Sequence, residues 1–411
     1  MAPEDWYSIR LDETSTVIDC KHRTPKYVNN GVPLVSPGTI KWGPLDLISP
    51  TKRVEQDEYE SLMDHCTVDV GDLVLSRNQS VGVASFVDSH GPFVLGQDTV
   101  LIKPTTSDSS FLFYNLQSVE TQRTIFKLAG GSTFSRINLG DIRKLKLIFP
   151  PLPEQQKIAR ILSTWDKAIT NTEKRIDNSK QQKKALMQQL LTGKKRFPGF
   201  KGEWEDKYLH DVAQIIVSPV DKKTVEGEIP VQICNYTDVY YNSRITKTLN
   251  FMSATAKQSE IDKYTLEVND VIVTKDSETP GDIAVPALVS EDLEGVVCGY
   301  HLAIIRPNEN LVEGAFLNYL FSIPKTRYYF FTLATGATRF GLSVGGINKA
   351  HFTLPPLEEQ QKIATALTNA DREIELLEQQ LADLKQEKKA LMQQLLTGKR
   401  RVTVDNKERV A

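Results

Sequence analysis

The sequence is poor in cysteine, and Cys20, Cys66, Cys234 and Cys298 form no CxxC pair. A disulfide framework is therefore not expected, and a reducing compartment suits such a chain. No apolar run approaches the length needed to cross a bilayer. The opening residues, MAPEDWYSIRLDE, carry early acids and no hydrophobic stretch, unlike a signal peptide. These absences together predict a cytoplasmic protein.

Motifs of the common catalytic and nucleotide-binding sites are also missing. The TGK triplets lack the glycine spacing of a P-loop, no GxGxxG follows a strand, and the six histidines form no HExxH. The FPPL and LPPL segments differ from the Asn/Asp-Pro-Pro-aromatic motif of nitrogen-directed DNA methyltransferases. Cys298 and His301 form a metal-like pair without a second half, and such pairs are mostly structural. We therefore expect a binding protein without a catalytic or metal site.

An excess of charge of one sign is lacking as well. The chain has 50 Lys and Arg against 52 Asp and Glu, a formal net charge of -2. A nucleic-acid partner would therefore have to meet positive charge that is only local. At 411 residues the chain is too long for one ordinary domain and fits two or three.

The chain instead contains two copies of one unit. The segment KKALMQQLLTGK occurs at 183–194 and again at 388–399. Upstream, PPLPEQQKIA at 150–159 returns as PPLEEQQKIA at 355–364, also 205 positions later. Because the two matched segments keep one offset, they enclose helices of equal length. Duplication explains this pattern, and it extends more weakly over the rest of the chain.

Each copy ends in a long amphipathic helix with a coiled-coil pattern. Apolar residues recur at alternating spacings of four and three. The predicted seam consists of Ile158, Leu162, Trp165, Ile169, Ile176, Leu186 and Leu190 in the first helix, and Ile363, Leu367, Ile374, Leu377, Leu381, Leu384, Leu391 and Leu395 in the second. Thr172, Ser179 and Lys183 weaken the first seam, and Lys388 interrupts the second.

The helix ends are also marked in the sequence. Pro153 suits a first helical turn, and Gly193 and Gly398 suit the C-terminal ends. Each helix then spans about 39 residues, or roughly 58 Å at 1.5 Å per residue. Antiparallel pairing is the simpler arrangement, since it places one globular domain at each end, whereas parallel pairing would crowd both domains together.

The globular parts have mixed helical and strand patterns. Strand-like segments bounded by turn residues lie at 32–36, 72–77, 99–104, 145–150, 229–233, 270–275 and 302–307, and short helices are expected near 111–118 and 315–322. The predicted class is α+β, with two similar α/β domains joined by two helices in an antiparallel, pseudo-two-fold coiled coil. The predicted parts are a first domain at 1–150, a first helix at 151–194, a second domain at 195–355, a second helix at 356–399 and a tail at 400–411.

Twin domains on a rigid rod suit duplex DNA, which offers two similar sites at a fixed separation. Arg, Asn and Gln read base edges, while Lys, Ser and Thr hold phosphates. The candidate DNA contacts are His22, Arg23, Lys26, Tyr27, Arg77, Asn78, Gln79, Ser132, Thr133 and Arg136 in the first copy, and Lys222, Lys223, Tyr241, Asn242, Arg244, Lys275, Thr338 and Arg339 in the second. A solvated surface is the alternative for any one of these loops.

Three further charged segments have a less specific meaning. The acidic stretch around Glu55, Asp57, Glu58 and Glu60 is expected to face away from DNA. KKR at 194–196 and KRR at 399–401 follow the helices. They either contact phosphate or, more simply, complement the negative end of the helix dipole.

The repeated helix borders, together with IDCKHRTPKY at 18–27, resemble the specificity subunit of a type I restriction–modification system over essentially the whole chain. The resemblance implies two target-recognition domains, each reading one half of an asymmetric bipartite DNA sequence, and a coiled coil that sets the spacer. It implies a non-catalytic chain without a cofactor of its own. The implied partners are two methyltransferase subunits with S-adenosylmethionine, and restriction subunits that use ATP and Mg²⁺, in a bacterial or archaeal cytoplasm.

The resemblance also implies that the outward helix faces receive the methyltransferase subunits. Gln155, Gln156, Gln360 and Gln361 are candidates for polar contacts with them, and a plain solvated face is equally open. The competing hypothesis is a non-enzymatic coiled-coil adaptor whose twin domains bind protein rather than DNA. The near-zero net charge is its best support.

Overall fold

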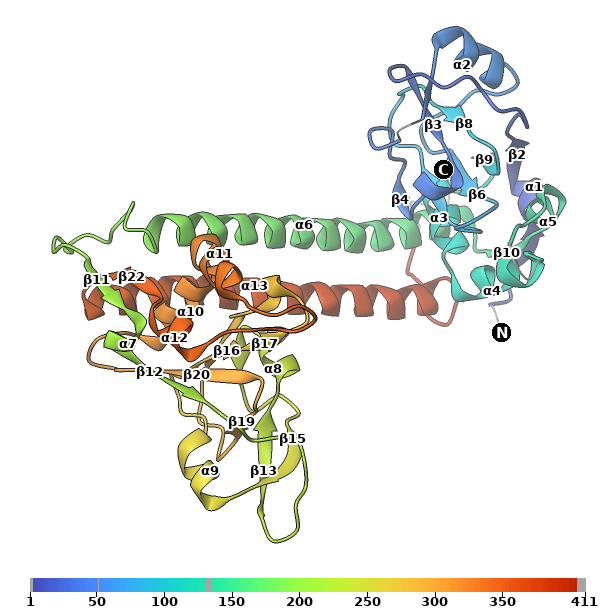
Figure 1. The fold of residues 1–411 in the computed structure, drawn as a ribbon. Helices are drawn as coiled ribbons and strands as arrows, with labels where there is room; N and C mark the ends of the chain where they lie inside the picture. Colours follow the sequence, from blue (N-terminus) through green and yellow to red (C-terminus); the bar gives the residue numbers. More distant parts are fainter. Residues whose placement is uncertain (1–2, 51, 131–134, 405–411) are drawn as a thin grey trace. The chain divides into compact units, whose positions relative to one another are not determined.

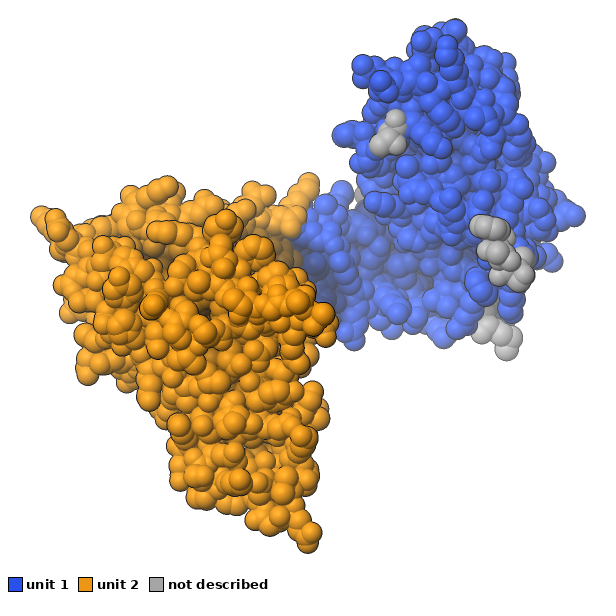
Figure 2. All heavy atoms as spheres, in the orientation of Figure 1, with its two compact units in different colours: residues 1–173, 379–411 blue, residues 174–378 orange. Residues whose placement is uncertain are grey.

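The computed structural model describes residues 3–50, 52–130 and 135–404. Its contacts divide the chain into two compact units, unit 1 with residues 1–173 and 379–411, and unit 2 with residues 174–378 (Figure 2). Two helices of 39 residues each, α6 (Leu152–Leu190) and α13 (Leu357–Leu395), contribute a segment to both units (Figure 1). Among the described residues, no helix combines the length and the apolar character of a membrane span.

The two globular parts contain similar successions of elements, and the second has additional short elements. Before α6 lie β1 (Tyr7–Arg10), α1 (Leu11–Thr14), β2 (Ser15–Asp19), β3 (Val32–Val35), η1 (Pro37–Thr39), β4 (Gly43–Pro44), β5 (Arg53–Val54), α2 (Gln56–Met63), β6 (Leu73–Ser76), β7 (Ala84–Phe86), β8 (Val94–Leu95), β9 (Thr99–Pro104), α3 (Ser109–Leu116), α4 (Val119–Leu128), α5 (Leu139–Arg143) and β10 (Lys146–Phe149). Between α6 and α13 lie β11 (Glu205–Tyr208), α7 (Leu209–Val212), β12 (Ala213–Val217), β13 (Ile229–Cys234), α8 (Tyr236–Tyr240), β14 (Arg244–Ile245), β15 (Met252–Ala256), α9 (Gln258–Tyr264), β16 (Val271–Thr274), β17 (Asp276–Ser277), η2 (Pro280–Asp282), β18 (Pro286–Val289), β19 (Val297–Cys298), β20 (Leu302–Pro307), α10 (Gly314–Ser322), α11 (Pro324–Leu333), β21 (Phe340–Gly341), α12 (Val344–Asn348) and β22 (His351–Leu354).

The sheets of the two units have equivalent strand orders. The five-stranded sheet runs β2-β9-β6-β7-β4 in unit 1 and β12-β20-β16-β18-β14 in unit 2. A three-stranded sheet follows the same correspondence, β5-β3-β8 and β15-β13-β19. Each strand-like segment and each short helix expected from the sequence contains the corresponding element. The prediction of two similar α+β parts is therefore confirmed.

Alternation along the central strands divides each unit into two apolar cores. In β6, Leu73 and Leu75 pack into the core that also holds the helix residues Ile158 and Leu395. Val74, between them, belongs to a second core on the opposite face of the sheet. Successive side chains of a strand point to opposite faces, so this strand is apolar throughout. The same alternation in β16 separates the two cores of unit 2.

Within each unit, the segments of α6 and α13 run antiparallel. The interhelical ion pairs are Asp166–Lys388 and Glu173–Lys385 in unit 1, and Lys180–Glu378 and Lys183–Asp371 in unit 2. In each unit, the residue number on one helix rises as that of its partner falls. The predicted seam residues of both helices are buried or half-buried. The antiparallel coiled coil is therefore present as predicted.

At each end of the helix pair, an arginine that follows one helix binds a buried glutamate of the other. Arg196, which follows α6, makes bidentate hydrogen bonds of 2.9 and 2.6 Å to Glu359 in the first turn of α13. Arg401, which follows α13, binds Glu154 in the first turn of α6 at 2.8 Å through both oxygens. The chain reaches these positions because Gly193 and Gly398 adopt φ values of +70° and +71°, which favour glycine.

These contacts correct the interpretation of the two basic tails. The arginine of each tail is engaged with a buried glutamate, so it is available neither to phosphate nor simply to the dipole of the helix that it follows. The neighbouring Lys194 and Lys399 are exposed and keep both possibilities.

The Arg196–Glu359 pair gives a testable prediction for stability. In Arg196→Met the Glu359 carboxylate, whose side chain is 0% exposed, loses its charged partner. We expect the free energy of unfolding to fall by about 3 kcal/mol, measured by urea titration of the full chain. Lys195→Met, at the exposed neighbouring position, is the matched control and should change it by less than about 0.5 kcal/mol. Equal losses in the two variants would contradict the assignment.

Candidate nucleic-acid interface

The candidate residues gather where the central strand of each five-stranded sheet ends. In unit 1 the chain leaving β6 forms a bridge between Asn78 and Arg136. In unit 2 the chain leaving β16 pairs Asp276 with Gly341 in the same way. Asp98, which directly precedes β9, and His301, which directly precedes β20, lie beside these segments. Three backbone segments far apart in the sequence therefore build an equivalent framework in each unit.

In unit 1 this framework borders a polar cleft of about 250 Å³. Arg23, Tyr27, Asn78 and Gln79, all candidates from the sequence, line it together with Asp98. We call this set the unit 1 cleft. Tyr27 is 43% exposed, and the Lys52 ammonium lies over its ring, 5.1 Å from the centroid. The cleft thus offers amide, cationic and aromatic groups side by side.

Two acids neutralise part of the positive charge of this cleft. Arg23 binds Glu58 of α2 through two hydrogen bonds of 2.6 and 3.0 Å. The hydrogen bonds from Arg23 hold the pKa of Glu58 below its ordinary value. Glu58, part of the acidic stretch expected to face away from DNA, therefore lies against one of the candidate DNA contacts. On the other side, Arg136 pairs with Asp98 at 2.7 Å.

Arg77 requires a correction. Its side chain is 6% exposed and donates to Asp19 at 2.8 Å and to the Ile137 carbonyl at 3.2 Å. The guanidinium points inward because these acceptors lie beneath the strand end. Arg77 therefore supports the framework and cannot contact DNA directly in this structure.

The remaining unit 1 candidates lie at the edge of the cleft or outside the description. His22 and Lys26 are exposed, and His22 Nε2 lies 3.0 Å from Asp19 Oδ2. Ser132 and Thr133 lie outside the described residues. In the described part of the chain, Asp19, Cys20 and His22 form the single group of three potential metal ligands. Asp19 is already bound by Arg77, and burial raises the pKa of the Cys20 thiol, so a structural role explains this group.

In unit 2 the equivalent position holds a different set of charges. Lys275 Nζ lies 2.9 Å from Asp276, and Asp276 Oδ2 lies 3.3 Å from His301 Nδ1. The Arg339 guanidinium approaches His301 Nε2 at 2.8 Å from the exposed loop before β21. We call these four residues the His301 cluster. Burial lowers the pKa of His301, and the neighbouring cations Arg339 and Lys275 act in the same direction.

Stacked tyrosines extend this surface in unit 2. Tyr236 and Tyr240 of α8 stack with ring centroids 5.4 Å apart, and Tyr241 meets Tyr240 edge-on at 5.0 Å. Tyr236 Oη lies 3.2 Å from the Ser277 hydroxyl, which fixes the helix beside the His301 cluster. Tyr241 is 76% exposed. An exposed aromatic edge beside hydrogen-bonding groups suits contact with bases and sugars.

The other unit 2 candidates are dispersed. Lys222, Lys223 and Thr338 are exposed, and Lys223 pairs with Asp221 at 2.7 Å. Asn242 is half-buried and caps the Asp238 carbonyl at 2.9 Å. Arg244 lines a small cavity against both long helices rather than the His301 cluster. The structure therefore places Arg244 apart from the His301 cluster, and its DNA contact stays a prediction.

The sequence analysis missed the two residues that occupy one equivalent place. Asp98 directly precedes β9, and His301 directly precedes β20. The segments DTVLIKP and HLAIIRP begin with these residues, so the repeat itself carried the signal. The two positions were not recognised as equivalent, because an aspartate does not suggest DNA contact and His301 was considered only as a partner of Cys298. Cys298 is fully buried and does not belong to the group of potential metal ligands found among the described residues.

Two of the four glutamines proposed for partner contacts are internal. Gln155 is 0% exposed and donates to the Pro150 carbonyl at 2.8 Å, while its oxygen accepts from the Asp108 amide at 3.0 Å. Gln360 repeats these bonds with Pro355 and Glu313. They are structural, and that prediction is corrected. Gln156 and Gln361 are exposed and stay candidates.

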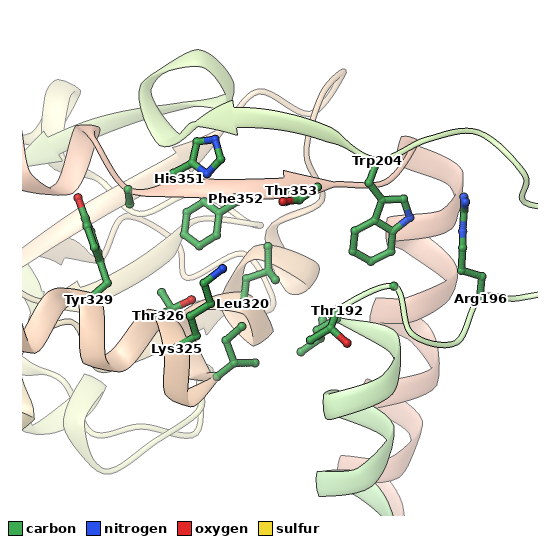
Figure 3. A pocket seen from close by; sticks show the side chains of 14 residues that line it. Thr192, Arg196, Trp204, Leu320, Lys325, Thr326, Tyr329, His351, Phe352 and Thr353 are labelled. Carbon is green, nitrogen blue, oxygen red and sulfur yellow. The ribbon is translucent and has the colours of Figure 1, made fainter.

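A cavity of about 590 Å³ lies elsewhere in unit 2, between the end of α6, β22 and α11 (Figure 3). Lys325 and Leu320 project into it, and the indole nitrogen of Trp204 has no hydrogen-bond partner in the described part of the chain. An equivalent groove of about 260 Å³ in unit 1 lies between the end of α13, β10 and α4. Asn115 lines this groove and donates to the Ile148 carbonyl at 2.7 Å.

The comparisons with known proteins agree with these features. The family model described as the type I restriction modification DNA specificity domain matches twice, at residues 3–179 and 201–386. A putative type I restriction enzyme MjaX specificity subunit from Methanocaldococcus jannaschii is 27% identical over 97% of this chain and 95% of its own length. The type I S subunit structure from M. genitalium has a TM-score of 0.60 at 14% identity, covering 95% and 96% of the two chains. The HsdS subunit structure from Thermoanaerobacter tengcongensis has a TM-score of 0.51 at 17% identity, covering 97% of this chain and 98% of its own. At these identities the two structures indicate the fold alone.

The electrostatics of the His301 cluster can be tested by titration. We expect the pKa of His301, measured by NMR, to lie below the usual value of about 6.5. Arg339→Gln should raise it and Asp276→Asn should lower it further, because they remove a cation and an anion respectively. The unfolded chain then binds more protons than the folded one, so the contribution of His301 to stability is lost as pH falls below about 6.5. A pKa above that value in the unmodified chain would contradict the geometry.

Proposed function

The chain belongs to the type I restriction–modification DNA specificity family, and we propose that its two units each read one half of an asymmetric bipartite DNA sequence. It is a DNA sequence-specificity subunit and carries no catalysis of its own. One observation carries the division into halves. Equivalent backbone frameworks hold unlike side chains, with Asn78 and Asp98 in unit 1 where Asp276 and His301 stand in unit 2.

Unlike hydrogen-bonding groups on one framework would select unlike bases. In unit 1 the proposed contacts come from the cleft and its rim, with Asn78, Gln79 and Arg136 suited to base edges. In unit 2 they come from Arg339, His301 and the exposed edge of Tyr241. The exposed lysines Lys26, Lys222 and Lys223 are suited to phosphate. Local cations of this kind reconcile DNA binding with a net charge of -2.

The long helices would set the spacer and receive the partners. We propose recognition domains at 1–150 and 195–355, with the helices at 151–194 and 356–399 between and after them. Grooves in equivalent places beside both helix ends suit a partner that binds twice, as two methyltransferase subunits would. S-adenosylmethionine, ATP and Mg²⁺ would then be bound by the methyltransferase and restriction subunits, in the cytoplasm, where the four free thiols stay reduced.

The central test is a map of methylated adenines in cells that contain the complete complex. We expect one bipartite motif, which disappears when this chain is deleted. His301→Ala with Arg339→Ala should relax one half of the motif by about tenfold in relative methylation, and Gln79→Ala with Arg136→Ala should relax the other, since a base contact contributes about 1–3 kcal/mol. Variants in either unit that change both halves equally would refute the division of labour.

Shortening the helices separates DNA reading from an adaptor role. Removal of one heptad from the middle of both α6 and α13 keeps the seam in phase. We expect the methylated motif to keep its two halves while its spacer shortens. The control removes three residues from each helix, which breaks the heptad phase and should abolish methylation altogether. An unchanged spacer after heptad removal would show that the helices do not measure it.

A further inference from the structure

The same three side chains meet in both units where the globular part touches the helix pair. In unit 1 Tyr114 Oη donates to Asp166 Oδ2 at 2.6 Å, and Lys388 Nζ donates to Asp166 Oδ1 at 2.5 Å. In unit 2 Tyr319 Oη donates to Asp371 Oδ2 at 2.6 Å, and Lys183 pairs with the other oxygen of Asp371. Each lysine also lies over the tyrosine ring, 5.4 and 5.5 Å from the centroids. We call these sets the two triads.

Each triad joins three elements and both repeats. The tyrosine belongs to α3 or α10 of the globular part, and the aspartate lies on the long helix of the same repeat. The lysine comes from the long helix of the other repeat, 205 positions from its counterpart. The tyrosines are buried, and the Lys388 and Lys183 side chains are 14% and 24% exposed.

These lysines are the charged residues among those that interrupt the apolar seam of the helix pair. A charged residue at a seam position lowers the stability of a coiled coil but specifies how its helices align. Apolar contacts are non-directional and tolerate small rotations and slides, whereas a charge-assisted hydrogen bond holds distance and angle. The packed cores therefore bring the globular part onto the helices, and the triads define its orientation there.

We propose that Tyr114, Asp166 and Lys388, and likewise Tyr319, Asp371 and Lys183, are positioning residues that fix each recognition domain on the helix pair and thereby sharpen the spacer length that the protein accepts. The inference rests on the proposed function, because it concerns the spacing between two half-sites. It goes beyond that function by naming residues that do not contact DNA but orient the recognition domains that do.

The test uses the complete complex and a panel of DNA duplexes that differ only in spacer length. In Lys183→Met with Lys388→Met an apolar residue replaces each lysine of the seam. Asp166 and Asp371 lose their charged partner but keep the tyrosine hydroxyl and, at 40% and 18% exposed, some contact with water, so the chain should fold with at most a modest fall in melting temperature. We expect its preference for the best spacer over one that is a base pair longer to fall by on the order of tenfold, the effect of about one lost charged hydrogen bond. Affinity for the best spacer should change by less than about threefold, a difference of under 1 kcal/mol.

The chain offers a matched control. Lys180 and Lys385 also form interhelical ion pairs, but their side chains are 54% and 53% exposed and no tyrosine joins them. Lys180→Met with Lys385→Met should leave the preference unchanged. Lys183→Arg with Lys388→Arg, which keeps the charge, should restore most of it. Tyr114→Phe with Tyr319→Phe removes only the hydroxyl donors and should reduce the preference by roughly threefold.

Three results would decide against the inference. Full spacer preference in the methionine variant would make the triads merely structural, and so would an equal loss in the Lys180 and Lys385 control. If the unmodified complex itself shows no spacer preference, the bipartite function fails and takes the inference with it. The first two results overturn the inference alone, because the unmodified complex then still shows a spacer preference.

Discussion

Two ion pairs between an arginine and a buried glutamate, Arg196 with Glu359 and Arg401 with Glu154, are the constraint on which the rest of the structure depends. Each glutamate lies in the first turn of one long helix, where the helix dipole favours negative charge, and each arginine follows the end of the other helix. Both pairs can close only if the helices run antiparallel and have the same length. An extra turn in one helix would carry its arginine about 5.4 Å past the glutamate and leave a buried charge unpaired. That the offset between the repeats is the same at the start and at the end of the helices thus follows from this requirement of equal length.

Each compact unit takes part of its core from both long helices. The main core of unit 1 contains Ile158 and Leu162 from the start of α6 together with Leu395 and Leu396 from the end of α13. Unit 2 is built in the same way from the end of α6 and the start of α13. Every interhelical ion pair also joins one repeat to the other. The sequence is duplicated, but each compact unit takes its helices from both copies, so neither repeat encloses its core alone.

The parts that could be predicted from the sequence are those fixed by periodicity. A seam of spacing four and three defines α6 and α13, and buried alternating strands define the sheets, because both depend on local pattern. The partners of polar side chains depend instead on residues far along the chain. Arg77 turns inward because Asp19 and Ile137 lie beneath it, and Gln155 is internal because the amide of Asp108 needs an acceptor. Lys388 could be recognised as an interruption of the seam, but its meaning required Tyr114 and Asp166, which no local pattern associates with it.

The division between framework and reading surface follows from burial. Residues that define the framework, such as Arg77 and Asp19, are tied to the strand ends by internal hydrogen bonds, so their substitution would change the fold. Gln79, Thr338 and Arg339 are exposed beside them, and substitutions there change little in the packing. A protein built in this way can alter which bases it prefers without losing stability, provided that its helices keep their length. On the proposed function, sequence preference and half-site spacing would then be set by separate groups of residues, the first in the exposed loops and the second in the buried contacts of the helix pair.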